Sequence, residues 1–219
     1  MTADRAKWIS PGRAVRVLGA LAAASFVGLL SYGLVAQSPD RTIDDALAQN
    51  RAVSAPGFNL DVLTDGRPGP LAPAWRRASQ DGTVDLEELQ GTPVVLNFWA
   101  SWCDPCREEA ALLQRGWQDA RRRGVLFLGL DMQDVRQDAR DFLREFRQDY
   151  PHVRDPDRGT ARRWGVTGIP ETYFISRRGE VVGHVIGTVT AKQLADGVQA
   201  ALSGRPRDPD QGGEQLAPR

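Results

Sequence analysis

Apolar and polar positions in the middle of the chain follow two different periods, which predict strands and helices in turn. Residues 94–99 (VVLNFW) and 125–130 (VLFLGL) are short apolar runs, typical of strands that are buried on both faces of a sheet. Between them we expect a helix that begins near Cys103 and ends at Gly124. The arginines at 121–123 would complement the negative C-terminal end of its dipole.

The second half of the chain continues this alternation. A helical stripe of apolar residues, closed by Pro151, comprises Val135, Ala139, Phe142, Leu143, Phe146 and Tyr150. The other expected elements are a short helix at 159–164, strands at 172–175 and 181–186 around the turn Arg178-Gly179, and an amphipathic helix at 191–202. Strands that alternate with helices predict an α/β fold in which helices flank a central mixed sheet.

The N-terminal region carries the longest apolar run. Residues 17–36 contain no Asp, Glu, Lys or Arg, and as a helix these 20 residues would be roughly 30 Å long, the thickness of a bilayer core. Basic residues precede the run and three aspartates follow it, so residues 1–16 should be cytoplasmic and the rest should face outward. We predict a single-pass anchor in the cell (inner) membrane, or else a signal peptide cleaved after Ala36; either way the domain reaches the periplasm or cell exterior.

Composition completes the domain plan. Of 219 residues, 41% are hydrophobic and 26% charged, as in a globular chain, and the net charge of zero gives no electrostatic reason to bind nucleic acid. Residues 37–54 are expected to be a linker with a short helix around 43–50, and residues 55–203 the folded domain. Residues 204–219 are rich in proline and glycine and are expected to be a disordered tail.

The candidate chemistry lies in the only two cysteines, Cys103 and Cys106, where the first strand meets the first helix. Free backbone N–H groups and the positive end of the helix dipole favour a thiolate at Cys103, and the thiolate is the nucleophile. Pro105 suits the first helical turn, which needs no N–H there. Cys106 can then attack a mixed disulfide at Cys103, which makes the pair a candidate redox disulfide.

Three other interpretations of the pair are weaker. A c-type haem site needs histidine directly after the second cysteine, and Arg107 stands there. A zinc site needs four ligands, but the only histidines, His152 and His184, are far apart in sequence. A structural disulfide across two residues would constrain almost no chain entropy. The sequence therefore predicts redox chemistry without a metal or cofactor.

Two segments resemble a known family. Residues 97–109 (NFWASWCDPCREE) look like the active-site segment of the membrane-anchored thioredoxin-like proteins TlpA, ResA and CcmG (also called DsbE), and residues 165–172 (GVTGIPET) resemble their second signature. The resemblance implies a thioredoxin-like fold with an N-terminal hairpin and a helix-strand insertion. It also implies that Pro170 is cis and lies beside the cysteines, so that the backbone of Ile169 can pair with substrate as an added strand. An ordinary proline at a strand start is the alternative.

The remaining candidates each carry two interpretations. The resemblance implies an active-site role for Glu171, which could instead be an exposed strand residue. It also implies a place near the cysteines for Glu109, which could instead be a solvated acid in the first turn of the helix. Asn97 stands where thioredoxin has a buried, proton-moving aspartate. Trp99 is expected in the core and Trp102 at the rim of the site. The family has one hairpin after an A-P-x-F motif, whereas this chain has two candidates, at 55–66 and 72–82, and the sequence does not decide which is inserted.

Asp104 indicates the redox direction. A carboxylate beside Cys103 disfavours the thiolate and therefore the reduced form, which makes the protein a reductant. The resemblance implies electrons from a DsbD- or CcdA-like membrane partner, and as client the Cys-x-x-Cys-His pair of apocytochrome c. The alternatives are reduction of copper-site cysteines for cytochrome oxidase, a general periplasmic oxidase or isomerase, and a membrane-tethered module that only binds partners.

Overall fold

The computed structural model of this chain describes residues 11–36 and 40–218, which divide into two units at Ser38 and Pro39. The described part of the first unit is one helix, α1 (Pro11–Ala36), which contains the predicted apolar run. Within the described residues, no helix combines the length and the apolar character that crossing a bilayer requires. The membrane anchor therefore stays a prediction of the sequence.

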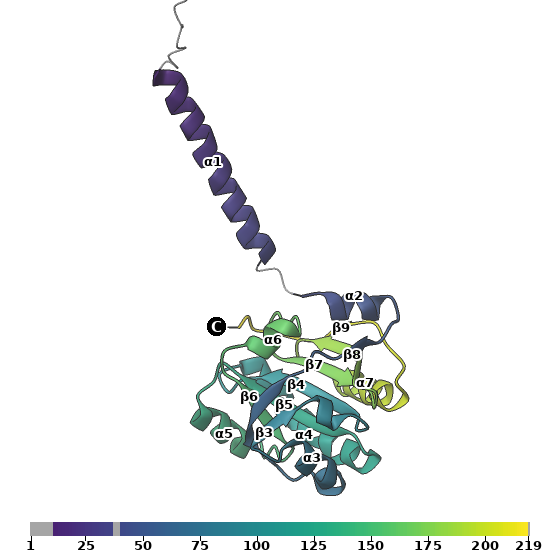
Figure 1. Cartoon of the computed structure of the whole chain (residues 1–219). Coiled ribbons are helices and arrows are strands. Elements are labelled where there is room, and N and C mark those ends of the chain that lie inside the picture. The colour runs from purple at the N-terminus through teal and green to yellow at the C-terminus, as the bar shows by residue number, and fades with distance from the viewer. Residues whose placement is uncertain (1–10, 37–39, 219) are drawn as a thin grey trace, which may run out of the picture. The chain divides into compact units, whose positions relative to one another are not determined.

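The second unit is built on a single mixed sheet (Figure 1). Its described strands run in the spatial order β1 (Val53–Ser54), β8 (Glu180–Ile186), β7 (Glu171–Ile175), β4 (Val94–Trp99), β5 (Leu126–Met132), β6 (His152–Asp155), β2 (Asn59–Thr64) and β3 (Thr83–Asp85), with β9 (Asp210–Gln211) also paired to β8. Strands β4, β5 and β6 are parallel, whereas β7 is antiparallel to both β4 and β8. The strand that ends at the cysteine motif therefore lies in the middle of the sheet.

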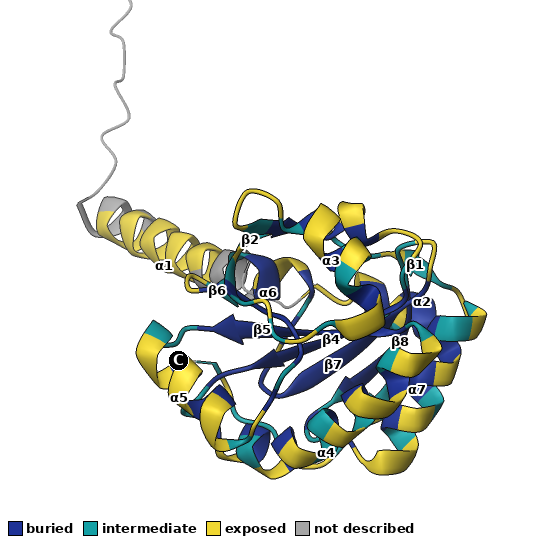
Figure 2. Cartoon of the chain, turned by 90° about the horizontal axis from the view of Figure 1, so that it is seen from below, coloured by how far each residue is buried: buried dark blue, intermediate teal, exposed yellow. Residues whose placement is uncertain are grey.

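Helices cover both faces of this sheet, as the alternation of elements predicts. Figure 2 shows α4 (Asp104–Ala120), α5 (Arg136–Glu145) and α7 (Ala191–Ser203) on one face and α6 (Gly159–Arg163) on the other, with their exposed sides away from the sheet. Helix α4 ends through the 3-10 turn η3 (Arg121–Arg123) at Gly124, whose φ of 79° is left-handed and suits glycine. The smaller helices are α2 (Thr42–Ala48), η1 (Gly69–Leu71), α3 (Ala72–Ala78) and η2 (Glu87–Leu89).

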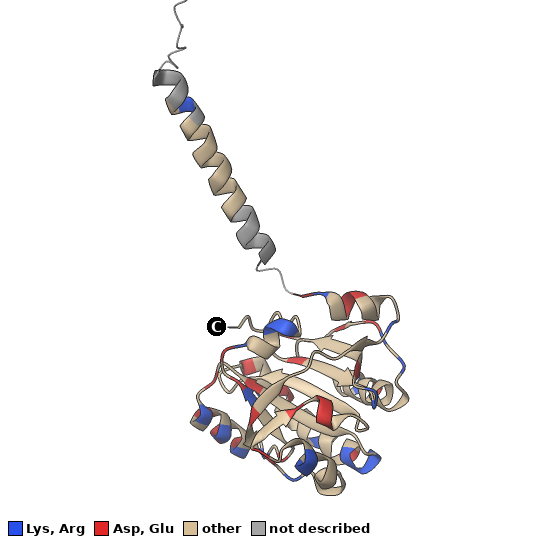
Figure 3. Ribbon diagram, in the orientation of Figure 1, with Lys and Arg blue, Asp and Glu red and all other residues tan. Residues whose placement is uncertain are grey.

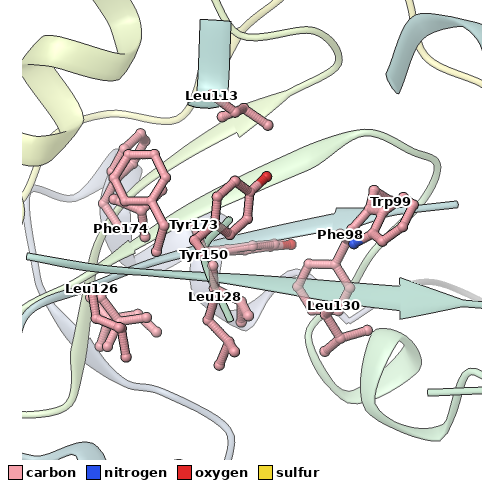
Figure 4. Packing of buried hydrophobic residues seen from close by; sticks show 14 of the residues in the cluster. Phe98, Trp99, Leu113, Leu126, Leu128, Leu130, Tyr150, Tyr173 and Phe174 are labelled. Carbon is pink, nitrogen blue, oxygen red and sulfur yellow. The ribbon is translucent and has the colours of Figure 1, made fainter. Parts of the chain in front are cut away.

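Two consecutive residues of β4, Phe98 and Trp99, point to opposite faces of the sheet and anchor the two layers of the core (Figure 4). Phe98 packs with Trp164 and Tyr173, at ring-centroid distances of 5.9 and 5.6 Å. Trp99 points to the opposite face and packs with Phe142 of α5 at 4.6 Å. Since all six residues of β4 are buried, the strand that leads into the cysteine motif is held rigidly from both sides.

Two predicted elements differ in detail from the structure. Val135 was placed on the buried stripe of a helix, but it is 61% exposed because it stands at the N-cap of α5, before the helical face begins. The second apolar run forms β5, which extends to Met132. The residue pattern did not predict strand β6, since its four residues include the polar His152, Arg154 and Asp155 and show no strand period. The helix-strand insertion that the resemblance implies does place a helix and a strand between α4 and Pro170.

The predicted domain limits of 55 and 203 are too narrow. The expected linker contains helix α2, as foreseen, but Ile43, Ala46 and Leu47 of that helix are buried against the domain, and β1 pairs with β8. The expected disordered tail is also wrong. Residues 204–218 follow the sheet edge through β9, because backbone hydrogen bonds hold a segment that has almost no apolar side chains to bury.

The structure decides between the two candidate hairpins. Strand β2, from the first candidate, pairs with β3, which begins at Thr83 after the second. The segment between these strands contains α3, so Ala72-Pro73-Ala74-Trp75 begins a helix rather than a second strand. Trp75 is buried, and its indole Nε1 donates to Asp65 at 2.9 Å. The insertion therefore lies inside the hairpin connection.

A candidate redox-active site

Cys103 and Cys106 form a disulfide at the N-terminal end of α4. Cys103 is the N-cap residue, and its Sγ accepts the backbone N–H of Cys106 at 3.1 Å. Pro105 occupies the first turn, where its missing N–H leaves no helical hydrogen bond unmade. The helix therefore directs a free N–H and its positive dipole end at the sulfur of Cys103, as the sequence predicts.

The second motif folds against the first. The peptide bond between Ile169 and Pro170 is cis, and the carbonyl oxygen of Ile169 lies 3.6 Å from Sγ of Cys103. All three residues are buried. The backbone of Ile169, expected to be free for a substrate strand, is already paired with Leu216 in both directions at 2.8 Å.

Glu109 stands one helical turn after Cys106 and is only 3% exposed. Its Oε1 accepts from Asn97 Nδ2 at 2.9 Å and its Oε2 accepts the backbone N–H of Val189 at 2.8 Å. Burial raises the pKa of Glu109 to about 7, although both hydrogen bonds act to lower it. The alternative of a solvated surface acid is therefore wrong, and the carboxyl can exchange a proton near neutral pH.

Glu171 follows the cis-proline and faces the opposite side of the sheet from Thr172, which bonds to Asn97. Its side chain is fully buried, so the alternative of an exposed strand residue is wrong. Its Oε1 accepts from the backbone N–H groups of Thr167 and Gly168 and from Gln215 Nε2, at 2.9, 3.2 and 2.7 Å. One carboxylate therefore fixes the loop that carries Ile169 and Pro170.

A buried histidine, which sequence reasoning did not assign to the site, completes this cluster. His184 bonds through Nε2 to Glu171 at 3.0 Å and through Nδ1 to Asp44 of α2 at 2.7 Å (acidic residues of α2 are red in Figure 3). Burial lowers the pKa of His184, but the bonds to Asp44 and Glu171 outweigh it and raise the pKa overall. The hairpin register contained a signal for this contact. His184 pairs with Tyr173, which stands two residues after Glu171 and therefore on the same face of the sheet.

We expect Glu171→Ala to lower the free energy of unfolding by roughly 3 kcal/mol, because it leaves the buried His184 and the N–H groups of Thr167 and Gly168 without their acceptor. The raised pKa of His184 means that its pairing contributes fully below pH ~6.5 and is lost as pH rises through the folded pKa. The loss should therefore be larger at pH 6 than at pH 9. Urea unfolding measures both values. The surface change Glu180→Ala, which breaks a pair with Arg178, is the control and should cost under about 1 kcal/mol.

The rim of the site is polar and partly open. Trp102 is half-buried, and its Nε1 donates to the carbonyl oxygen of Gln133 at 3.0 Å, which agrees with the expected rim position. Asp104 is exposed. Asp134 accepts from the hydroxyl of Ser101 at 2.8 Å, a contact between loops that the sequence did not reveal. Within the part of the chain that the structure describes, no three His, Cys, Asp or Glu side chains are grouped to hold a metal ion.

The arrangement brings the predicted residues together around one disulfide. Cys103 lies at the helix end beside Ile169 and Pro170, while Cys106 lies one turn further in and one turn before Glu109. A thiolate stabilised by helix N–H groups can attack a disulfide, and a nearby carboxyl with pKa about 7 can accept the proton of the second thiol. The chemistry that fits is thiol–disulfide exchange.

Comparisons with known proteins agree with this chemistry. Residues 43–184 match the AhpC/TSA family. The chain is 32% identical to the thiol:disulfide interchange protein DsbE of Allochromatium vinosum, over 89% of this chain and 94% of that protein. It is 30% identical to the thiol:disulfide interchange protein HelX of Rhodobacter capsulatus, over 84% and 93%.

Two further similarities cover less of the chain. The thiol-disulfide oxidoreductase ResA of Bacillus subtilis is 29% identical over 52% of this chain, and the match spans 63% of ResA, less than two thirds of its length. The fold superposes with a TM-score of 0.56 on a crystal structure described as a thiol:disulfide interchange protein DsbE from Chlorobium tepidum. That protein is 27% identical, and the match covers 68% of this chain and 96% of that one.

Proposed function

The chain belongs to the AhpC/TSA family and is a thiol–disulfide oxidoreductase of the DsbE, HelX and ResA type, and from this premise we propose that it reduces disulfides of exported proteins. The client we propose is the Cys-x-x-Cys-His pair of apocytochrome c before haem attachment. The observation that carries the proposal is the Cys103–Cys106 pair at a helix N-terminus, beside the cis-proline loop.

The proposed reaction has two exchange steps. The Cys103 thiolate attacks one sulfur of the client disulfide, forming a mixed disulfide and releasing the other client sulfur as a thiolate. Cys106 then loses its proton to Glu109 and attacks Cys103, which closes the Cys103–Cys106 disulfide and frees the second client thiolate. Two electrons pass from protein to client in each cycle, so a second dithiol must return them. We propose a DsbD- or CcdA-like membrane protein as that donor.

We also propose that residues 17–36 anchor the chain in the inner membrane with the domain outside the cytoplasm. The support is the run of 20 residues without Asp, Glu, Lys or Arg, with basic residues before it and aspartates after it. This orientation would place the Cys103–Cys106 pair in the compartment where client disulfides form.

Client choice can be tested with disulfide peptides. The reduced chain should reduce an oxidised Cys-x-x-Cys-His peptide at least about tenfold faster than a peptide of equal length with a Cys-x-x-Cys pair from a copper site. Stopped-flow tryptophan fluorescence follows the reaction. Equal rates would remove the preference for apocytochrome c, and a faster reaction of the copper-site peptide would favour the alternative client.

Asp104 gives a separate prediction about redox direction. The midpoint potential should lie on the reducing side, at roughly −220 mV or lower. Because the exposed Asp104 carboxylate next to Cys103 disfavours a thiolate, Asp104→Asn should stabilise the reduced form and raise the potential by roughly 20 mV. Titration against glutathione measures both, with Glu108→Gln, an exposed helix acid, as the matched control. A wild-type value near −120 mV would identify an oxidant instead.

A further inference from the structure

The substrate edge expected at Ile169 is occupied by the chain itself. The N–H of Ile169 donates to the carbonyl oxygen of Leu216 and the N–H of Leu216 donates to the carbonyl oxygen of Ile169, both at 2.8 Å, as an antiparallel bridge. That same Ile169 oxygen lies 3.6 Å from Sγ of Cys103. An extended peptide from another protein would need the same two backbone groups to add here as a strand.

The occupying segment is a strap formed by residues 205–218. In Figure 1 it is the yellow stretch after α7, which runs beside β8 and ends near α6. Its path is fixed by backbone hydrogen bonds to the sheet edge and the loop after β8: Arg207 N to Val182 O, Gly212 N to Ile186 O, Gly213 N to Thr188 O and Thr188 N to Glu214 O. Gln215 adds a side-chain bond to the buried Glu171 at 2.7 Å.

The fit at the cis-proline loop depends on glycine. A Cβ on Gly168 would come within 2.7 Å of the carbonyl oxygen of Leu216, and one on Gly187 within 2.3 Å of the carbonyl oxygen of Gly213. Only glycine at these positions lets two backbones approach so closely. The strap therefore packs directly against the backbone of Gly168 and Gly187.

We infer that the strap is a built-in competitor, which occupies the position of the client strand and leaves when a client polypeptide pairs with Ile169. This inference rests on the proposed function, since it concerns access of an extended client to the same disulfide. It also assigns Leu216 the place of the client residue that pairs with Ile169 beside the reacting sulfur.

Access to the sulfur of Cys103 requires some movement of the chain around it. Cys103 is 0% exposed and Ile169 is 0% exposed, so a client polypeptide cannot reach the attacking atom or its pairing edge in this arrangement. Thiol–disulfide exchange needs direct contact between an attacking sulfur and the sulfur it attacks. A segment near Cys103 must therefore move, and the strap is held to Ile169, which contacts that sulfur, by two hydrogen bonds.

The strap has the composition of a releasable segment. None of the residues from 202 to 218 is buried, and Leu216 is the only large aliphatic side chain after Leu202. A segment with so little apolar burial of its own opens at a low free energy compared with the core. Apparent client affinity is then reduced by the fraction of molecules in which the strap is open.

Access to Cys103 can be measured without any client. In a reduced Cys106→Ser background, the full chain in mild detergent is treated with iodoacetamide or with a maleimide that carries a polyethylene glycol chain. Deleting residues 212–219 should raise the maleimide rate at least about tenfold relative to the iodoacetamide rate. The ratio of the two rates cancels any change in the thiolate fraction. An unchanged ratio would overturn the inference, whatever the activity on disulfides.

Point variants separate release of the strap from damage to the fold. Leu216→Pro removes the N–H that bonds to Ile169 and should raise the maleimide ratio, whereas Leu216→Ala keeps both backbone bonds and should leave it near the parent value. A synthetic peptide of residues 208–219, added to the deletion variant, should restore protection and compete with disulfide peptides. If Leu216→Pro behaves as Leu216→Ala and the peptide protects nothing, the strap is not a competitor. A client rate of zero in every variant would instead refute the proposed function.

Discussion

Cys106→Ser is expected to accumulate mixed disulfides with client proteins, while Cys103→Ser should trap none. The attacking sulfur is assigned from position, because the two cysteines are almost equally buried, at 0% and 2% exposure. Cys103 caps the helix and lies beside Ile169, where a client strand would pair. Cys106 lies one turn inside the helix and is bonded to Cys103, so it is placed to resolve a mixed disulfide rather than to start one.

Non-reducing gels of membranes from cells that make each variant would show the adducts, and mass spectrometry would identify the client. The double variant Cys103→Ser with Cys106→Ser controls for adducts that do not depend on this site. Because serine cannot resolve the adduct, its amount should exceed that of the parent chain by at least about tenfold. Equal trapping by both single variants would contradict the assigned roles.

The central elements of the fold could be predicted because local pattern and tertiary environment agree there. Strand β4 has the predicted bounds, and α4 continues through η3 to the predicted glycine, which has a left-handed φ. The apolar run determines burial of the strand on both faces, and the glycine determines where the helix stops. The cysteine motif lies between these two features, so its place at the head of a helix followed from the sequence.

The environment of the carboxyls could not be predicted from local pattern. Glu109 and Glu171 have the same side chain as any surface acid, and only long-range partners decide that they are buried. Glu109 bonds to Val189, which lies 80 positions later in the chain. His184, the partner of Glu171, bonds to Asp44, which lies 140 positions before His184. The free-energy cost of burying these carboxyls is offset by hydrogen bonds to residues far away in the chain. Such partners produce no periodic pattern in the sequence.

The strap was missed for a related reason. Its composition, rich in proline and glycine and poor in apolar residues, is typical of a disordered segment, because such a segment cannot bury enough apolar surface to order itself. In the structure the order comes from the edge of β8 and from Ile169, which supply partners for its backbone. The composition of a segment indicates how much apolar surface it can bury. It does not indicate which sheet edge can pair with its backbone.

Glu109→Gln is expected to slow reduction of a disulfide substrate by about ten- to hundredfold near pH 7.5 while leaving the Cys103–Cys106 disulfide able to form. Resolution requires Cys106, 2% exposed, to lose its proton where a thiolate is poorly solvated. Glu109 has a pKa of about 7, so it is mostly ionised and able to accept that proton above neutral pH. The wild-type rate should rise through pH ~7, whereas the Gln variant should rise only nearer the usual thiol pKa of ~8.5.

The raised pKa also has a stability consequence of known sign. A carboxyl whose folded pKa is about 7 and whose unfolded pKa is 4.5 favours the folded state fully below pH 4.5, and this contribution is lost as pH rises through 7. The cost is roughly 3 kcal/mol at pH 8 for a fully buried group. Urea unfolding of the parent chain should therefore become easier between pH 5 and 8, and Glu109→Gln should flatten this dependence.

The control exchanges the hydrogen-bonding roles of two neighbours. In the double variant Asn97→Asp with Glu109→Gln, the new Gln amide can donate to the new Asp, and its oxygen can still accept the N–H of Val189. The Asp can also accept from the hydroxyl of Thr172, which bonds to Asn97 at 3.0 Å in the parent. A buried carboxyl is thus kept in the same cluster, and the rise in rate near neutral pH should return.

Stopped-flow tryptophan fluorescence from pH 5 to 9 distinguishes the outcomes. If Glu109→Gln keeps both the rate and the pH profile of the parent, Glu109 has only a structural role. If the single variant is slow and the double variant is equally slow at every pH, hydrogen bonding at position 109, rather than proton transfer, limits the reaction.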